Sequence, residues 1–289
     1  MAQPRWIEIN CDMGEGFGRW KMGPDEDLMQ YVDVANIACG FHAGDPSTMA
    51  RTARLAKQHG VRVGAHPGLP DLVGFGRRRM DIAAADVHAA VLYQVGALAG
   101  ILAAEGVPLN HVKPHGELYF SVQRDAATRD AVLRAVRAFD VPVYGLPTAA
   151  MRDDCRRLGV TLVPELYVDI DYDDTGALVP VAESARATPD SITDRVETFR
   201  RTGQVKSRTG AMVDTLVARQ GSSICIHSDL PGALENAAAA KAVVNKLQES
   251  GGVGGNHLGY IDPSARTRMN RGFGAENSPV TRSAAHQRR

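Results

Sequence analysis

The sequence has few cysteines and no excess of either charge. Only 4 of its 289 residues are Cys, and its 33 basic residues balance 33 acidic ones. Four cysteines without close pairing exclude a disulfide scaffold or a structural zinc cluster. We expect Cys11, Cys39 and Cys225, which lie in apolar runs, to be core thiols, with Cys11 and Cys225 as candidates to border a site. A balanced charge favours neither nucleic acid nor an anionic membrane as a partner.

Targeting segments and the common nucleotide motifs are also missing. The N-terminus lacks the apolar region of a secretory signal, and no uninterrupted apolar stretch approaches the thickness of a bilayer. No Walker A sequence occurs, and Gly14, Gly16 and Gly18 do not have the spacing of a dinucleotide fingerprint. We therefore expect a soluble, cytoplasmic protein without a classical phosphate-binding loop.

Strand and helix signals alternate without a linker from the first residues to about position 249, which favours one α/β domain over residues 1–250. Strands are expected at residues 6–12, 34–39, 61–66, 109–113, 141–146, 160–169 and 222–229. Helices are expected at residues 46–59, 84–105, 126–139, 148–158 and 232–248. Helices that join successive parallel strands predict a (β/α) barrel of seven strands.

Two segments depart from this alternation. Residues 170–221 suggest an elaborated loop with a helix at roughly 190–202, long enough to form a lid. Residues 251–289 are polar, rich in arginine and without periodicity, so we expect a flexible tail.

Five of the expected strands end in titratable side chains among glycines. The strand ends carry Asp12 and Glu15, then His42 and Asp45, then His66, then Lys113 and His115, and finally His227 and Asp229. The C-terminal ends of parallel barrel strands meet at one rim, where barrel enzymes hold their active sites. The pattern indicates an enzyme with its site at that rim.

Each cluster also has a structural alternative. Asp12 and Glu15 suit metal binding, orientation of water or acid–base chemistry, or Asp12 merely caps a turn. His42 suits a base, an acid or a metal ligand oriented by Asp45, or Asp45 only caps the next helix. Lys113 suits polarisation of a carbonyl, with a pKa lowered by burial, or a buried ion pair with Asp12 or Glu165.

Two further motifs carry weaker signals. Arg77, in the run Arg77–Arg79, is a candidate clamp for an anionic substrate, although such runs are usually solvated. His227, Ser228 and Asp229 are poorly placed for a triad, because adjacent strand residues point to opposite faces. Asp229 is better explained as an additional acid, base or orienting group.

These motifs resemble those of the LamB/YcsF lactam-utilisation family. The resemblance covers about residues 6–249 and rests on the stretches Asn10–Gly18, Ala35–Pro46, Gly64–Gly68, Asp71–Arg77, Tyr93–Leu98, His111–Gly116 and Leu178–Pro180. It implies a seven-stranded barrel related to glycoside hydrolases and sugar deacetylases. It also implies ATP-dependent opening of 5-oxo-L-proline to L-glutamate together with subunits B and C of a 5-oxoprolinase, with ATP and Mg handled jointly with those partners.

Three positions differ from the family pattern. Ile170 and Val181 stand where arginine is usual, and Ser228 stands where glycine is usual. If those arginines bind a substrate carboxylate, an alkyl side chain loses a charge-assisted contact. The alternative is therefore a paralogue that acts on another lactam or amide.

The working hypothesis assigns a role to each rim residue. Asp12 and His42 form the acid–base centre, Lys113 and His115 stabilise developing charge, and Glu15, His66 and Asp229 support them. The expected substrate-binding residues are Asn10, Asn36, Asp45, Arg77, Glu165, Asp169 and His227. One rival is a deacetylase-like hydrolase with a divalent metal on Asp12, His42 and His66. Another is a non-catalytic subunit that binds the lactam.

Overall fold

Seven parallel strands close into a barrel in the order β1-β2-β3-β4-β5-β6-β9. The computed structural model describes residues 7–215, 217 and 221–250, so the expected tail at 251–289 lies outside the described residues. The barrel strands are β1 (Ile7–Met13), β2 (Val34–Ala38), β3 (Arg62–His66), β4 (Leu109–Val112), β5 (Val143–Gly145), β6 (Leu162–Tyr167) and β9 (Ser222–His227). The predicted seven-stranded barrel is confirmed.

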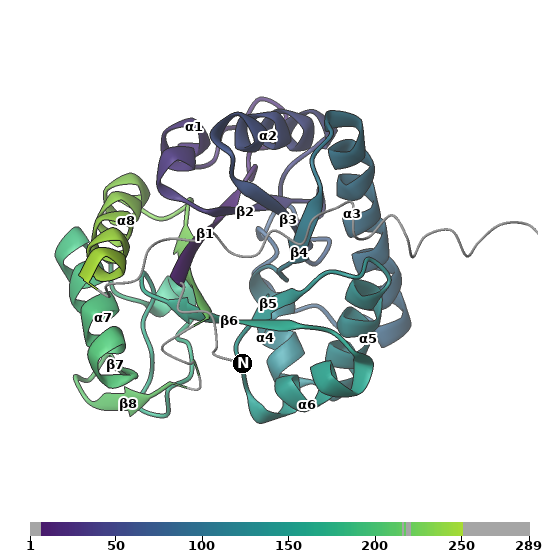
Figure 1. Cartoon of the computed structure of the whole chain (residues 1–289). Coiled ribbons are helices and arrows are strands. Elements are labelled where there is room, and N and C mark those ends of the chain that lie inside the picture. The colour runs from purple at the N-terminus through teal and green to yellow at the C-terminus, as the bar shows by residue number, and fades with distance from the viewer. Residues whose placement is uncertain (1–6, 216, 218–220, 251–289) are drawn as a thin grey trace, which may run out of the picture. The chain divides into compact units, whose positions relative to one another are not determined.

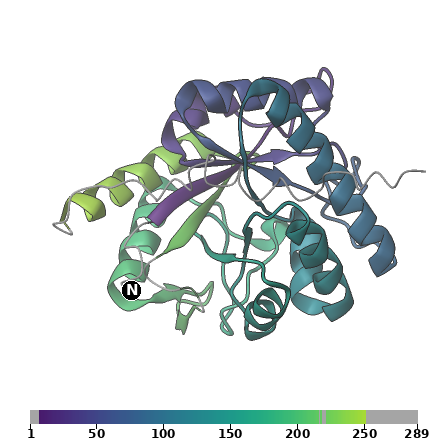
Figure 2. The ribbon, with the colours of Figure 1, turned by 45° about the vertical axis from the view of Figure 1, so that its right-hand side comes forward.

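Helices surround the barrel in both views of the ribbon, as Figure 1 and Figure 2 show. They are α1 (Asp25–Leu28), α2 (Pro46–His59), α3 (Ala84–Glu105), α4 (Gly116–Arg124), α5 (Ala126–Arg137), α6 (Ala149–Leu158), α7 (Pro189–Thr202) and α8 (Ala233–Ser250), with the 3₁₀ turns η1 (Met29–Tyr31) and η2 (Val181–Glu183). The helices expected from the sequence are present with small shifts of their ends.

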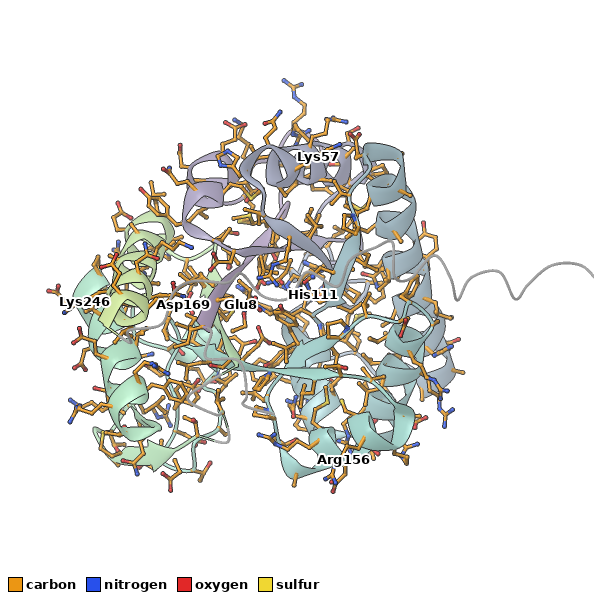
Figure 3. All side chains as sticks on the ribbon, in the orientation of Figure 1. Glu8, Lys57, His111, Arg156, Asp169 and Lys246 are labelled. Carbon is orange, nitrogen blue, oxygen red and sulfur yellow. The ribbon has the colours of Figure 1, made fainter. Side chains whose placement is uncertain are left out.

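The two faces of the strands have different compositions. In β1 the apolar residues Ile7, Ile9, Cys11 and Met13 belong to the core that packs against the helices. The intervening Asn10 and Asp12 bind partners from other strands across the barrel interior. This alternation follows from the period of two in a strand. Figure 3 shows Glu8, His111 and Asp169 within the ring, whereas Lys57, Arg156 and Lys246 lie on the outer helices.

The predicted helix signals act as expected. Asp45 caps α2 by accepting hydrogen bonds from the amides of Ser47 and Thr48, and Gly60 ends that helix in the left-handed conformation. Gly106 ends α3 in the same way. The four cysteines are buried free thiols, so the expected core thiols are confirmed.

Besides the short helices α1, η1 and η2, helix α4 and a hairpin within residues 170–221 were not expected. Helix α4 begins at Gly116, whose φ is 50°. A glycine is not a helix-start signal, so this helix was not expected. The segment 170–221 contains the expected helix as α7, and also an antiparallel hairpin of β7 (Gln204–Lys206) and β8 (Met212–Asp214). Strands of three residues are too short to show a periodic pattern.

Helix α3 is long and apolar enough to cross a membrane by length and composition alone, a property that was not expected from the sequence. Its buried residues Val87, Val91, Val95, Leu98 and Leu102 all belong to the hydrophobic core of the barrel. Helix α3 therefore packs one apolar face against the barrel, as a helix of the outer layer does.

Removal of the α2 cap should lower stability measurably. Asp45 accepts the amides of Ser47 and Thr48 and also that of Gly18 in the loop after β1. Asp45→Ala should therefore lower the free energy of urea unfolding by about 1–2 kcal/mol. Asp125→Ala is the matched control, because Asp125 caps the N-terminus of α5 through the Thr128 amide and has, among the described residues, no contact like that of Asp45 with Gly18, so its loss should be smaller. Equal losses would show that the Gly18 contact adds nothing.

Candidate active site

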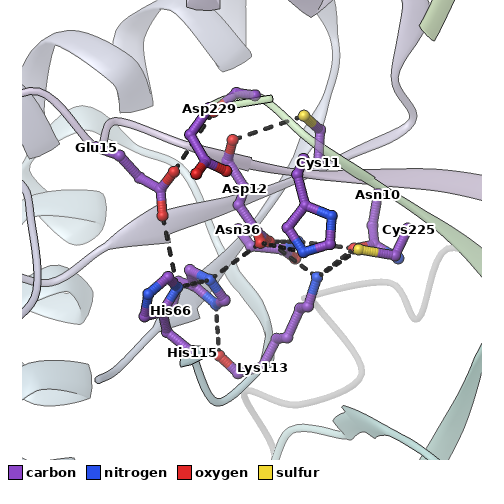
Figure 4. Close-up of polar contacts among 12 residues, drawn as sticks. Asn10, Cys11, Asp12, Glu15, Asn36, His66, Lys113, His115, Cys225 and Asp229 are labelled. Atoms are coloured by element: carbon purple, nitrogen blue, oxygen red, sulfur yellow. Dashed lines mark hydrogen bonds and ion pairs between the residues drawn. The ribbon is translucent and has the colours of Figure 1, made fainter. Parts of the chain in front are cut away.

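The Lys113 ammonium group lies at the centre of the barrel interior. The residue is only 1% exposed, and its Nζ lies 2.9 Å from Asp12 Oδ1, 3.3 Å from Glu165 Oε1 and 3.0 Å from Cys225 Sγ. A further contact of 3.0 Å joins it to Asn10 Oδ1. These partners come from three different strands, as Figure 4 illustrates for Asp12, Asn10 and Cys225.

Lys113 and Asp12 form a charged pair. Burial favours the neutral amine, but Asp12, Cys225 and Glu165 outweigh it and hold the pKa of Lys113 well above its usual value. Burial likewise acts against the Asp12 carboxylate, yet His66 and Lys113 keep its pKa well below the usual range. The pKa of Lys113 expected from the sequence was wrong in direction, because burial was considered without its partners. The buried ion pair, given as the alternative, is present.

Amide side chains form the layer beneath this pair. Asn36 Nδ2 donates to Asp12 Oδ1 and to Asn10 Oδ1, each at 2.8 Å. Asn36 Oδ1 lies 2.6 Å from His111 Nε2, and a Cβ on Gly64 would lie only 2.0 Å from the His111 ring. His111 therefore fits only because residue 64 is glycine. The network fixes the two oxygens that receive Lys113.

A second group, here called the imidazole cluster, consists of Glu15, His42, His66 and His115. His66 Nδ1 lies 2.7 Å from the carbonyl oxygen of Lys113, and its Nε2 lies 3.3 Å from Asp12 Oδ2. His115 Nε2 lies 2.8 Å from the carbonyl oxygen of Phe75, and its Nδ1 lies 3.0 Å from His66 Nε2. The cluster thus borders the Lys113–Asp12 pair through His66.

His42 and Glu15 complete the imidazole cluster. The rings of His42 and His115 stack with centroids 3.7 Å apart and an interplanar angle of 5°. Glu15 Oε1 lies 3.4 Å from His42 Nε2 and 3.5 Å from His115 Nδ1. Burial lowers the pKa of His42 and of His115 and raises the pKa of Glu15. Each of these shifts favours the uncharged form of its side chain.

Glycines next to the imidazole cluster make room for the stacked rings. A Cβ on Gly68 would lie 2.5 Å from His42 Nδ1, and one on Gly76 would lie 2.7 Å from His42 Cβ. The backbone of Gly68 is held by Gln94 on α3, which accepts its amide and donates to its carbonyl oxygen, both at 3.0 Å. The glycine-rich motifs after β3 are therefore explained by close packing.

The edge of the site carries two more ion pairs. His227 Nδ1 lies 3.0 Å from Asp169 Oδ1, and this carboxylate raises the pKa of His227 against the opposing effect of burial. Arg77, with 31% of its side chain exposed, pairs with Asp229 at 2.8 Å. Ser228 Oγ contacts Glu15 Oε2 at 3.5 Å. His227 and Ser228 thus bind different partners, as strand alternation predicts.

Of the residues predicted for the site, Asp45 is the one that takes no part in these networks, because it caps α2 and binds Gly18. The others lie together: Asn10, Asp12, Glu15, Asn36, His42, His66, Arg77, Lys113, His115, Glu165, Asp169, His227 and Asp229. Their catalytic and binding roles stay predictions. Ile170 is 2% exposed and belongs to the hydrophobic core.

His111, a polar residue of the site, was not predicted, and Cys225 was expected only as a candidate to border it. His111 precedes Lys113 by two positions, and Cys225 precedes His227 by two. Residues two apart on a strand share a face, so the alternation that placed Lys113 and His227 inside the barrel also places these two there. Cys225 lies between two isoleucines, so its position in an apolar run suggested a core thiol first.

Comparison with known proteins gives the family. The LamB/YcsF family model matches residues 7–253. The chain belongs to the LamB/YcsF family. Curated relatives include the lactam utilization protein lamB of Emericella nidulans, 44% identical over 84% of this chain and 96% of the relative. The A subunit of 5-oxoprolinase from Bordetella pertussis is 46% identical over 79% of this chain and 90% of the relative.

A solved structure supports the same relationship. The crystal structure of the lactam utilization protein from Thermus thermophilus matches with a TM-score of 0.76 at 40% identity. The match covers 84% of this chain and 97% of the Thermus chain. The barrel is therefore the fold of the LamB/YcsF family.

Replacing one member of the Lys113–Asp12 pair should lower the free energy of unfolding more than replacing both members. Lys113→Met leaves the buried Asp12 carboxylate without its cation, and we expect a loss of roughly 3–5 kcal/mol in the free energy of unfolding. The double variant Lys113→Met/Asp12→Asn should recover part of that loss, because no unpaired charge remains. Urea unfolding of both single variants and the double variant measures the coupling, and additive losses would contradict a buried ion pair.

The loop that carries Glu15 should make stability depend on pH through Asp25. This carboxylate accepts the Gly14 amide at 2.8 Å, and burial raises its pKa from 3.8 to about 6. The stabilisation of the folded state by protonated Asp25 is therefore fully present below pH 3.8 and is lost as the pH rises through about 6. Asp25→Asn, whose amide oxygen still accepts from Gly14, should gain about 1.4 kcal/mol between about pH 5 and about pH 8 relative to the parent. The exposed neighbour gives the control Glu26→Gln, and an Asp25→Asn curve parallel to the parent curve would reject this origin.

Proposed function

We propose that this chain is an A-type subunit of a 5-oxoprolinase, which opens 5-oxo-L-proline to L-glutamate with hydrolysis of ATP. Relatives named as the A subunit of 5-oxoprolinase share 46% and 43% identity with it over 79% and 85% of its length. The single structural observation that carries the proposal is the buried Lys113–Asp12 pair at the C-terminal ends of the strands, where barrel enzymes act on their substrates.

The chemistry of a lactam explains the need for such a centre. The amide is stabilised by resonance, so opening requires a polarised carbonyl and an activated water molecule. A buried ammonium group stabilises negative charge that develops on the carbonyl oxygen more strongly than an exposed one. ATP assists when the amide oxygen takes the γ-phosphoryl group with release of ADP. Addition of one water molecule at the carbon then breaks the C–N bond, which frees the amine and leaves an acyl phosphate. A second water molecule hydrolyses this acyl phosphate to the carboxylate of glutamate and phosphate.

Asp12 positions the ammonium group for this task. The carboxylate is ionised, and its Oδ1 accepts both Lys113 and Asn36, so the Lys113 side chain has a fixed direction. Arg77 at the edge of the site is the candidate partner for the carboxylate of the substrate, because it is partly exposed and already pairs with a carboxylate, Asp229. Asp229 then holds Arg77 in place until substrate arrives.

Nucleotide handling requires partners in this proposal. The sequence has no Walker A motif, and the names of the 5-oxoprolinase relatives, which designate one subunit by a letter, indicate a multi-subunit enzyme. Subunits of types B and C therefore share the binding of ATP and Mg with this chain, in the cytoplasm. Ile170 and Val181, which replace the arginines usual in the family, make a related lactam the alternative substrate.

The test is glutamate release and ATP hydrolysis by this chain with and without its B-type and C-type partners, over a panel of lactams. Asp12→Asn should lower turnover at least about 100-fold, because Lys113 loses its ionised partner, while circular dichroism stays unchanged. Asp130→Asn on the surface of α5 is the control. Full turnover by folded Asp12→Asn would reject the assignment, and turnover of another lactam alone would support the paralogue.

A further inference from the structure

The hydrogen atoms on the imidazole cluster can be placed from its contacts with backbone carbonyls. A carbonyl oxygen only accepts, so His66 carries its hydrogen on Nδ1, toward the Lys113 carbonyl, and His115 carries its hydrogen on Nε2, toward the Phe75 carbonyl. The remaining nitrogens, His66 Nε2 and His115 Nδ1, hold lone pairs whenever the rings carry one hydrogen each, and Asp12 Oδ2 lies 3.3 Å from the same His66 Nε2. The two nitrogens lie 3.0 Å apart, so a positively charged species between them is needed to stabilise the contact.

Two more side chains direct lone pairs to the same place. Neither nitrogen of His42 has a hydrogen-bond partner among the residues that the structure describes, and the same holds for Glu15 Oε1. His42 and Glu15 are 1% and 3% exposed. Buried polar atoms without partners are costly. One shared proton would form a hydrogen bond between only two of these atoms. A metal ion would bind one ligand atom from each of the four side chains.

The spacing of the donors suits a metal of the size of zinc. Bonds of about 2.0–2.1 Å in a tetrahedral site place neighbouring ligand atoms roughly 3.3 Å apart. The observed separations are 3.0 Å for His66–His115, 3.4 Å for His42–Glu15 and 3.5 Å for His115–Glu15. All four donor atoms lie within 4.8 Å of one another. The stacked rings of His42 and His115 present their edges side by side.

The second group of possible ligands, Asp12, Cys225 and His227, does not fit a cation. The Lys113 ammonium group lies 2.9 Å from Asp12 Oδ1 and 3.0 Å from Cys225 Sγ. A metal there would meet a fixed positive charge. Because Asp12 Oδ1 already binds Lys113, we leave Asp12 out of the ligand set proposed here and include Glu15 and His115 beside His42 and His66.

We propose that Glu15, His42, His66 and His115 bind one divalent transition-metal ion, with zinc as the preferred metal. Three imidazoles and one carboxylate are ligands that Zn²⁺ prefers. The carbonyl oxygens of Lys113 and Phe75 orient two of the rings, as outer partners of metal-bound histidines do. With the ion bound, these rings act as ligands and do not transfer protons in the lactam reaction.

The test uses the full-length, untagged chain after treatment with a chelator, titrated with Co²⁺ as a spectroscopic probe. We expect one Co²⁺ per chain with the visible absorption of a four-coordinate site, displaced by one equivalent of Zn²⁺. His42→Gln should weaken binding more than about 100-fold. Because His42 makes no hydrogen bond among the described residues, this variant should fold, as its urea midpoint will show.

Matched controls separate this site from other histidines. His88→Gln removes an imidazole that contacts the Ala131 carbonyl on the outer helices, and His257→Gln/His286→Gln removes those near the C-terminus; both should bind Co²⁺ as the parent does. Glu15→Gln provides a second ligand variant. The proposal would be overturned if the folded parent bound less than one Co²⁺ or Zn²⁺ per chain. It would also be overturned if both ligand variants bound the metal with the affinity of the parent. The readout is metal binding, so it is independent of lactam turnover.

Discussion

The pairing of Lys113 with Asp12 is the interaction on which the interior of the barrel depends. A lone ammonium group at that depth would carry a large desolvation cost, so the surrounding strands provide anionic or polar partners. Asp12 supplies the charge, and Asn10 and Asn36 supply oriented amides. Other ion pairs at the bottom and at the edge of the barrel, Glu8–Arg62 and Asp169–His227, follow the same rule. In each of these places a buried charged group therefore has an oppositely charged partner close by.

Against that background the imidazole cluster differs in kind. Burial favours the uncharged forms of Glu15, His42 and His115. The cluster lies next to a balanced ion pair, and its lone pairs are directed at one another rather than at protein donors. The neighbouring glycines allow this packing, since side chains at residues 68 and 76 would collide with His42. A barrel that needed only a stable core would gain nothing from such an arrangement. The arrangement is what a cation-binding site requires.

The sequence predicted the fold well because each barrel strand is a short run rich in apolar and β-branched residues that ends in glycine or a polar cluster. The helices were equally clear where a cap and a terminal glycine marked both ends, as Asp45 and Gly60 do for α2. Helix α4 was missed because it starts at a glycine, and the β7–β8 hairpin because its strands are very short. Local signals fail where tertiary contacts set the boundary.

The sequence predicted which residues lie in the candidate site better than it predicted their charges and partners. Strand ends identified Asp12, His42, His66, Lys113 and His115 without knowledge of their distances. The pKa of Lys113 and the partition into an ion pair and an imidazole cluster depend on separations across the barrel, which no single strand contains. His111 could have been found by extending the inward alternation one step down its strand, and the same step supports Cys225, which was expected as a candidate to border the site.

The most direct measurement of the role of Lys113 is a crystal structure of the assembled enzyme with 5-oxo-L-proline bound. We expect the lactam carbonyl oxygen within hydrogen-bond distance, about 3 Å, of Lys113 Nζ, with the substrate carboxylate toward Arg77. A lactam bound elsewhere on the chain, with Lys113 still enclosed by Asp12 and Glu165, would contradict this role.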